Sequence, residues 1–194
     1  MFTTGRAPAD VRLVISCCGA NRLALVDGTG CLVWKVTGQH FESIDAGPIR
    51  KDIPGRQIAV DIAHTPFGKA SLWLFDDRGN HLGTYTCDDS RHHRLIDWDG
   101  DGFEEILLAH TCRLLDGHGR CVARLGPIDA FASEAGAPGK NADASPFAVI
   151  GDLDGDERPE IILHSQTKIL IYRNERAARI PALRLTTGVN FTLY

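Results

Sequence analysis

Residues 93–125 read HRLIDWDGDGFEEILLAHTCRLLDGHGRCVARL, and in this stretch short apolar runs alternate with turn residues. One pair of apolar runs flanks an acidic loop, and a second pair flanks the segment that contains Asp116 and Gly117. Short apolar runs bounded by Gly and Asp are typical of β-strands joined by tight turns. The stretch therefore predicts four short antiparallel strands.

The second half of this stretch recurs along the chain as an apolar run, an Asp, a Gly-containing turn and another apolar run. The copies are LALVDGTGCLVWKV at 23–36, LWLFDDRGNHLGTYT at 72–86, RLLDGHGRCVARL at 113–125 and, more loosely, ILIYRNERAARIPAL at 169–183. Their anchor residues, Asp27, Asp76, Asp116 and Arg173, are 49, 40 and 57 residues apart. We attribute the turns to the Asp-Gly pairs, because Gly adopts positive φ at little cost.

Further apolar runs, such as VRLVIS at 11–16 and EIILHS at 160–165, precede the hairpins, so that each repeat contains about four strands. A period of about 40–57 residues with four strands per repeat is typical of propeller blades. The sequence predicts an all-β fold: a β-propeller of about four four-stranded blades, either a closed small propeller or part of a larger one. We expect a single domain, residues 1–194, with residues 1–10 or the C-terminal tail supplying the opening strand of the first repeat. The expected repeats are 1–44, 45–90, 91–128 and 146–194, with a loop insertion at 129–145.

The composition excludes several classes of protein. The chain has 194 residues, of which 43% are hydrophobic and 24% charged, with 20 Gly and a formal net charge of −4. A chain of this kind is not disordered throughout, and its acidic balance argues against nucleic acid as a partner. It has no apolar run of the roughly 20 residues that a membrane span needs. No signal peptide is visible, so we expect a cytoplasmic protein as the chain stands, or an extracellular one if it is truncated at the N-terminus.

Two acidic loops share one spacing of carboxylates. DWDGDGFEEI occupies residues 97–106, and DLDGDERPEI repeats its spacing 55 residues later at 152–161. Acids at positions 1, 3 and 5 point into the loop centre, and the position 7 carbonyl and the position 9 acid close the shell. Such closely packed oxygens repel one another unless a hard cation lies between them, and Ca²⁺ suits a flexible all-oxygen site. The predicted ligands are Asp97, Asp99, Asp101, Phe103 and Glu105 in the first loop, and Asp152, Asp154, Asp156, Arg158 and Glu160 in the second.

We therefore expect about two Ca²⁺ ions with a structural role; the alternative is that both loops are surface acidic turns without metal. An EF-hand is excluded, because it needs Glu at position 12, where the loops have Leu108 and Leu163. In the second loop Glu157 replaces the Gly of position 6, which loses an easy sharp turn. The second repeat has Gln57 in place of the acid and is expected to have lost its metal.

Three histidines each end the apolar run that follows the acidic-loop position, namely His64, His110 and His164. If these runs line a central channel, the histidines form a ring for proton transfer or ligand binding. The favoured alternative is that they are half-buried and hydrogen-bonded at strand ends, because duplication alone explains their recurrence. We expect His92 and His93 to be exposed.

The two acidic loops resemble the calcium loops of FG-GAP (integrin alpha-type) and related propeller repeats. From about Arg50 to the C-terminus, HRLIDWDGDGFEEILLAHTCRLLDGHGRCVAR and FAVIGDLDGDERPEIILHSQTKILIYRNE also resemble the carboxyl-terminal blades of rhamnogalacturonan lyases. Those enzymes are calcium-dependent eight-bladed propellers that cleave pectin backbones by β-elimination. The resemblance implies that the loop acids of positions 1, 3, 5 and 9 are calcium ligands, and it assigns no catalytic residue.

Two functions follow as hypotheses. The first is a non-catalytic calcium-binding propeller module that binds a polysaccharide or a protein. The alternative is a rhamnogalacturonan-type polysaccharide lyase, or a fragment of one, that cleaves uronic-acid polymers by β-elimination. Such chemistry needs a base, for which His110 and His164 are the candidates. If the ring is incomplete within one chain, we also expect self-association.

Overall fold

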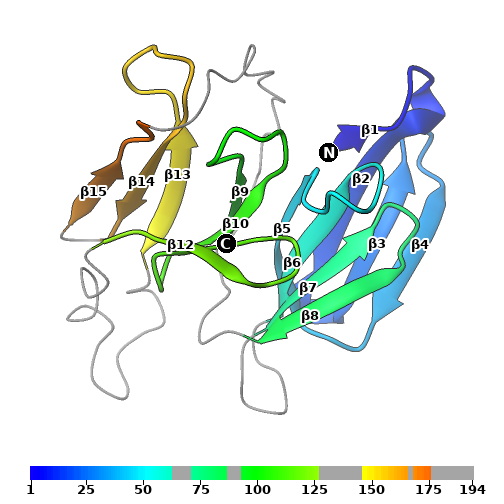
Figure 1. Ribbon diagram of the computed structural model, residues 1–194. Coiled ribbons are helices and arrows are strands. Elements are labelled where there is room, and N and C mark those ends of the chain that lie inside the picture. Colours follow the sequence, from blue (N-terminus) through cyan, green and yellow to red (C-terminus); the bar gives the residue numbers. More distant parts are fainter. Residues whose placement is uncertain (63–70, 87–92, 127–145, 166–167, 176–194) are drawn as a thin grey trace. The chain divides into compact units, whose positions relative to one another are not determined.

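The computed structural model describes residues 1–62, 71–86, 93–126, 146–165 and 168–175 (Figure 1). In these residues the fold is all-β, as predicted, with fifteen strands and two short 3-10 helices, η1 (Pro8–Asp10) and η2 (Cys18–Ala20). No helix in the described part of the chain is long and apolar enough to cross a membrane.

The strands form four antiparallel sheets in which each strand pairs with the next one in sequence (Figure 1). The first contains β1 (Phe2–Thr3), β2 (Val11–Cys17), β3 (Arg22–Asp27) and β4 (Leu32–Thr37). The second contains β5 (Phe41–Gly47), β6 (Gln57–Ile62), β7 (Ser71–Asp76) and β8 (His81–Thr86). The third contains β9 (Arg94–Ile96), β10 (Glu105–Leu108), β11 (Arg113–Leu115) and β12 (Cys121–Arg124). The fourth contains β13 (Phe147–Gly151), β14 (Glu160–His164) and β15 (Ile169–Tyr172).

The described residues thus form four successive antiparallel sheets, the number of strand groups that the sequence predicts. Residues 1–10 supply the opening strand of the first sheet, because β1 pairs with β2. The second sheet begins at Phe41, a few residues before the predicted repeat boundary. The described part of the fourth sheet has three strands, and the sheets do not show a closed ring. The insertion at 129–145 lies outside the described residues.

The sheets belong to two compact units. The first unit contains the first two sheets, whose apolar faces pack together. Its core includes Leu23 and Leu25 of β3, which alternate with less buried residues as expected of a strand with one buried face. The ring of Trp34 stacks on Phe75 with centroids 5.9 Å apart. All six residues of β6 are buried, so this central strand is covered on both faces.

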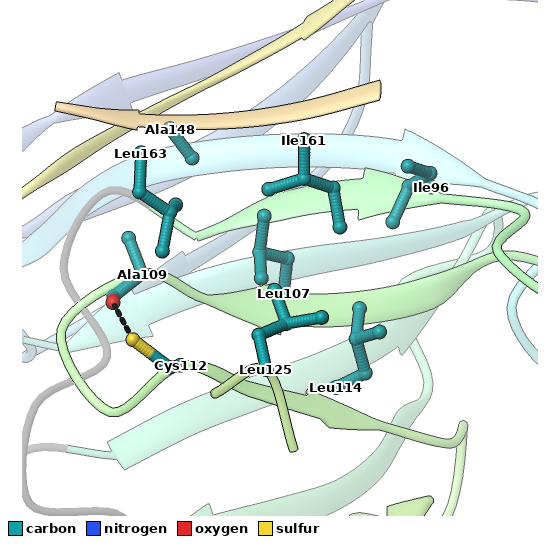
Figure 2. Close-up of a cluster of buried hydrophobic side chains, with 9 residues drawn as sticks. All are labelled: Ile96, Leu107, Ala109, Cys112, Leu114, Leu125, Ala148, Ile161 and Leu163. Carbon is teal, nitrogen blue, oxygen red and sulfur yellow. Dashed lines mark hydrogen bonds between the residues drawn. The ribbon is translucent and has the colours of Figure 1, made fainter. Parts of the chain in front are cut away.

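The second unit contains the third and fourth sheets together with residues 49–51. Its core joins β10 and β11 of one sheet to β14 of the other. In Figure 2 Leu107 lies in the middle of the labelled side chains, with Ile161 and Leu163 of β14 on one side and Leu114 of β11 on the other. All four residues of β10 are buried. The two predicted metal loops lead into β10 and β14 and therefore into the core of this unit.

The repeated Asp closes each hairpin turn in the same way. Asp76 Oδ1 accepts hydrogen bonds from the N–H groups of Arg78 and Asn80, at 3.0 and 2.8 Å. Asp27 and Asp116 each make the corresponding pair of bonds two and four residues ahead. One carboxylate thus satisfies two turn donors, which explains why the repeat keeps an Asp at this place.

The attribution of these turns to Asp-Gly pairs is wrong. The positive φ is adopted three residues after each Asp, at Gly30, Gly79 and Gly119, with values of 87°, 84° and 79°. Gly28, which directly follows Asp27, is needed for a different reason. A Cβ at Gly28 would lie 2.2 Å from the carbonyl oxygen of Pro8, so only Gly permits this close approach.

Replacing Asp76 with Ala is expected to lower the free energy of unfolding of the first unit by about 1 kcal/mol, because two backbone donors lose their common acceptor. Urea unfolding measures this change. The neighbouring Asp77→Ala is the matched control and should change stability by less than about 0.5 kcal/mol. Equal effects of the two substitutions would contradict the role of Asp76.

One other expectation differs from the structure. His93 is fully buried rather than exposed, because it directly precedes β9 and lies in the packed part of the second unit. Cys17, Cys18, Cys31 and Cys121 are exposed, Cys112 is buried, and these five described cysteines are free. His92 and Cys87 lie outside the described residues.

Candidate metal centre

Both acidic loops occupy the same place in their sheets. Residues 97–104 connect β9 to β10, and residues 152–159 connect β13 to β14. The acid of position 9 is in each case the first residue of the buried strand. Glu105 opens β10 with 9% of its surface exposed, and Glu160 opens β14 with 3% exposed.

The first loop is folded around its own carboxylates. Asp97 accepts the N–H groups of Gly100 and Gly102, at 2.8 and 2.9 Å, one on each carboxylate oxygen. The Asp99 carboxylate accepts the N–H of Asp101 at 3.1 Å, and the Asp101 carboxylate accepts that of Phe103 at 2.9 Å. Glu105 Oε2 accepts the N–H of Trp98 at 2.8 Å, which ties the start of the loop to β10.

The second loop repeats these bonds position by position. Asp152 accepts the N–H groups of positions 4 and 6, at 2.7 and 3.1 Å. The Asp154 carboxylate accepts the N–H of Asp156 at 3.3 Å, and the Asp156 carboxylate accepts that of Arg158 at 2.9 Å. Glu160 Oε2 accepts the N–H of Leu153 at 2.8 Å. Two segments with different residues at positions 2, 6, 7 and 8 thus share one hydrogen-bond pattern.

Three of the four predicted carboxylates in each loop lie close enough together to hold a metal ion. In the first loop, one oxygen each of Asp97, Asp99 and Asp101 lies within 4.8 Å of the others. In the second loop the same limit holds for Asp152, Asp154 and Glu160. Every contributing atom is an anionic oxygen, the donor type that Ca²⁺ and Mg²⁺ prefer.

An unsatisfied oxygen points to a ligand in the second loop. Glu160 is almost completely buried, and its Oε1 has no hydrogen-bond partner, although Oε2 is bonded to Leu153. A buried carboxylate oxygen without a partner is costly. Because this side chain also belongs to the carboxylate cluster, a cation among Asp152, Asp154 and Glu160 would satisfy it. The residues present therefore fit a divalent metal.

The first loop has a related electrostatic signature. Burial raises the pKa of Glu105 to about 7, against the hydrogen bond from Trp98 that favours the charged form. Repulsion from Asp99, Asp101 and Asp97 contributes in the same direction as burial. Burial also raises the pKa of Asp97. A cation beside Glu105 and Asp97 would stabilise the charged form that burial disfavours in these two carboxyl groups.

The second loop keeps its turn without the Gly of position 6. Glu157 adopts φ of 68°, close to the 90° of Gly102 at the same position of the first loop. A residue with a Cβ is strained in this region. The second loop therefore keeps the sharp turn that Gly makes in the first loop. The cost is backbone strain at Glu157, which adopts a left-handed conformation.

Glu157→Gly is expected to raise the free energy of unfolding of the second unit by roughly 0.5–1 kcal/mol, because relief of left-handed strain exceeds the entropy that Gly adds to the unfolded chain. Thermal unfolding in EDTA measures it without metal. The reciprocal change Gly102→Ala should lower stability, since its φ is 90°. A loss of stability with Glu157→Gly would contradict the assignment of strain.

The corresponding loop of the second repeat is held together by Gln57, the first residue of β6. Its buried side-chain amide donates hydrogen bonds to the carbonyl oxygens of Ile53 and Gly55, at 3.2 and 3.1 Å. Here an uncharged donor binds loop oxygens from the position that holds a Glu in the two acidic loops. With Gln in place of Glu, the side chain of residue 57 itself binds the loop carbonyl oxygens, a role that a metal ion would otherwise have.

The catalytic candidates occupy different places. His164 is the last residue of β14, and its ring stacks on Phe147 with centroids 5.6 Å apart. His110 is half-buried and lies beyond the end of β10. His110 lies five residues after the first residue of β10, whereas His164 lies four residues after the first residue of β14. The two histidines therefore do not occupy equivalent positions in their sheets. His64 lies outside the described residues.

Three residues near the loops did not emerge as site residues from the sequence: Lys51, Arg173 and Asn174. Lys51 pairs with Asp101, and Arg173 pairs with Asp154 at 2.5 Å. Asn174 donates a hydrogen bond to the Trp98 carbonyl at 2.5 Å. These residues lie outside both acidic loops in the sequence. The spacing of the loop acids therefore could not predict that they contact the loops. A shallow hollow of about 480 Å³ beside the first loop is lined by Trp98, Asp99, Ala123, Arg173, Asn174 and Glu175.

Fold and site together define an all-β protein of four successive antiparallel sheets with two matching acidic loops suited to a divalent cation. Comparison of the chain with protein-family models and with curated proteins finds no match. The similarity to FG-GAP repeats and to rhamnogalacturonan lyases remains a prediction from the sequence.

Proposed function

We propose that this chain is a calcium-binding module of the β-propeller type, in which the ions stabilise the loops that enter β10 and β14. The proposal depends on the hydrogen-bond pattern that both acidic loops share. In the second loop this pattern includes Glu160, whose buried Oε1 has no hydrogen-bond partner. The same bonds in two loops argue that the carboxylates are held for a common purpose. The hydrogen bond to Leu153 accounts for Glu160 Oε2, whereas a surface turn without a ligand does not account for the buried Oε1.

Calcium fits these loops better than other common metals. The predicted shell consists of carboxylates at positions 1, 3, 5 and 9 and one backbone carbonyl, which are hard oxygen ligands. No cysteine or histidine is among them, so zinc and copper are disfavoured. Magnesium demands near-ideal octahedral geometry and retains several waters, whereas calcium accepts irregular shells. We propose one Ca²⁺ in each loop.

The biological role that we propose is non-catalytic binding of a polysaccharide or a protein by a calcium-stabilised repeat array. The lyase alternative predicts an unsaturated product, detectable by its absorbance, when the folded protein is incubated with rhamnogalacturonan and calcium. Absence of that product counts against the alternative and leaves the binding module unaffected.

Isothermal titration calorimetry tests the metal proposal. The wild-type chain should bind about two Ca²⁺, Asp99→Ala and Asp154→Ala about one each, and the double variant none. Asp77→Ala, an acid of the first unit outside the acidic loops, is the control and should keep both sites. A wild-type chain that takes up no calcium would falsify the proposal.

A further inference from the structure

Each acidic loop is contacted by a basic side chain from outside the loop. In the first, the Lys51 ammonium donates to Asp101 Oδ2 and lies 5.7 Å from the centroid of the Phe103 ring. Lys51 precedes Asp101 by 50 residues, so the fold and not the local sequence brings them together. Asp101 occupies position 5, one of the predicted calcium ligands.

In the second loop the contact comes from Arg173, the residue directly after β15. Its Nη2 lies 2.5 Å from Asp154 Oδ2 and 3.7 Å from Asp156 Oδ2. These two acids hold positions 3 and 5 of the loop. Arg158 also approaches Asp156, with Nε 3.8 Å from Oδ2. The guanidinium of Arg173 therefore neutralises two of the four acids from the solvent side, and its side chain is 57% exposed.

The position of Arg173 is fixed by its neighbour. Asn174 is 2% exposed, and its side-chain amide donates to the Trp98 carbonyl at 2.5 Å. The Asn174 carbonyl in turn accepts a hydrogen bond from Arg158 Nη1 at 3.4 Å. The backbone at Arg173 is thereby anchored to both acidic loops. The side chain itself is 57% exposed, so solvent is available to it on the side away from Asp154.

We propose, on the basis of the calcium function above, that Lys51 and Arg173 are resident counter-ions that a metal must displace and that set the metal affinity of their loops. In the absence of metal they offset the repulsion among the aspartates. When a divalent cation enters, the carboxylate oxygens turn to it, and the ammonium or guanidinium withdraws towards solvent. The metal thus binds in competition with a cation that belongs to the protein.

The size of the effect follows from simple electrostatics. A unit positive charge a few ångströms from a divalent ion at a solvent-exposed site opposes its binding by an amount that corresponds to about a tenfold change in affinity. The effect is screened by salt, since both basic side chains are largely exposed. Removal of the charge should therefore tighten calcium binding, and more so at low ionic strength.

The test uses calcium titrations of the full chain by calorimetry in an Asp99→Ala background, which isolates the second loop. Adding Arg173→Met should tighten binding about tenfold, whereas Arg173→Lys should stay within about threefold of the parent because it keeps the charge. Arg120→Met is the matched control: Arg120 pairs with Asp116 at 2.8 Å outside the acidic loops, and its removal should leave the affinity unchanged.

Unchanged or weaker binding by Arg173→Met, in a parent that binds calcium, overturns this inference and leaves the proposed function standing. A parent and a wild type that both fail to bind calcium overturn the proposed function itself. If Arg173→Met does not fold, the calcium affinity of Lys51→Met in an Asp154→Ala background tests the inference on the first loop. There too, tighter binding supports the inference, and unchanged or weaker binding overturns it.

Discussion

Calcium at one hundred times its dissociation constant is expected to raise the free energy of unfolding of the second unit by about 2.7 kcal/mol for each loop that it fills. Two filled loops therefore give about 5 kcal/mol, the largest effect expected for this chain. The reason is that the ion binds acids assembled by the folded strands and has no comparable site in the unfolded chain. Thermal unfolding with calcium and with EDTA measures the difference.

Variants divide this effect between the loops. Asp99→Ala and Asp154→Ala should each lose about half of the calcium-linked rise in melting temperature, and the double variant all of it. Asp77→Ala keeps the full rise. Magnesium at the same concentration should stabilise less, because it demands stricter geometry. A wild-type melting temperature that does not respond to calcium would sink the metal assignment.

Leu107→Ala is expected to lower the free energy of unfolding by about 3–5 kcal/mol, because it leaves a cavity in the core of the second unit. Leu107 is fully buried and contacts the cluster that joins the third and fourth sheets (Figure 2). It also follows Glu105 by two residues on β10, so both side chains lie on the same face of the strand. Urea unfolding in EDTA measures the loss.

The comparison variant is Val122→Ala on β12, where the side chain is 54% exposed. It should cost less than about 0.5 kcal/mol. Calcium should restore part of the stability that Leu107→Ala loses, because the ion fixes the start of the same strand. Equal costs of the two truncations would show that the two sheets do not share the core described here.

Most of the fold could be predicted from the sequence because its signals are local. Runs such as VRLVIS at 11–16 and EIILHS at 160–165 became β2 and β14 nearly residue for residue. The hairpins at Asp27, Asp76 and Asp116 were placed correctly from the recurring Asp and Gly, although the Gly with positive φ is the third residue after Asp. The acidic loops were also located correctly, because their bonds join residues only two to seven apart.

The sequence by itself thus determined strands, turns and the spacing of the loop carboxylates, since each depends on contacts between neighbours along the chain. The tertiary structure alone decided which side chains are buried and which distant charges meet. His93 is buried although its neighbours are polar, and Glu160 keeps an unsatisfied oxygen because β14 is covered by another sheet. Lys51 and Arg173 reach the loops only because residues 49–51 and the end of β15 pack into the same unit. Burial and long-range ion pairs depend on how sheets stack, which no local pattern of residues specifies.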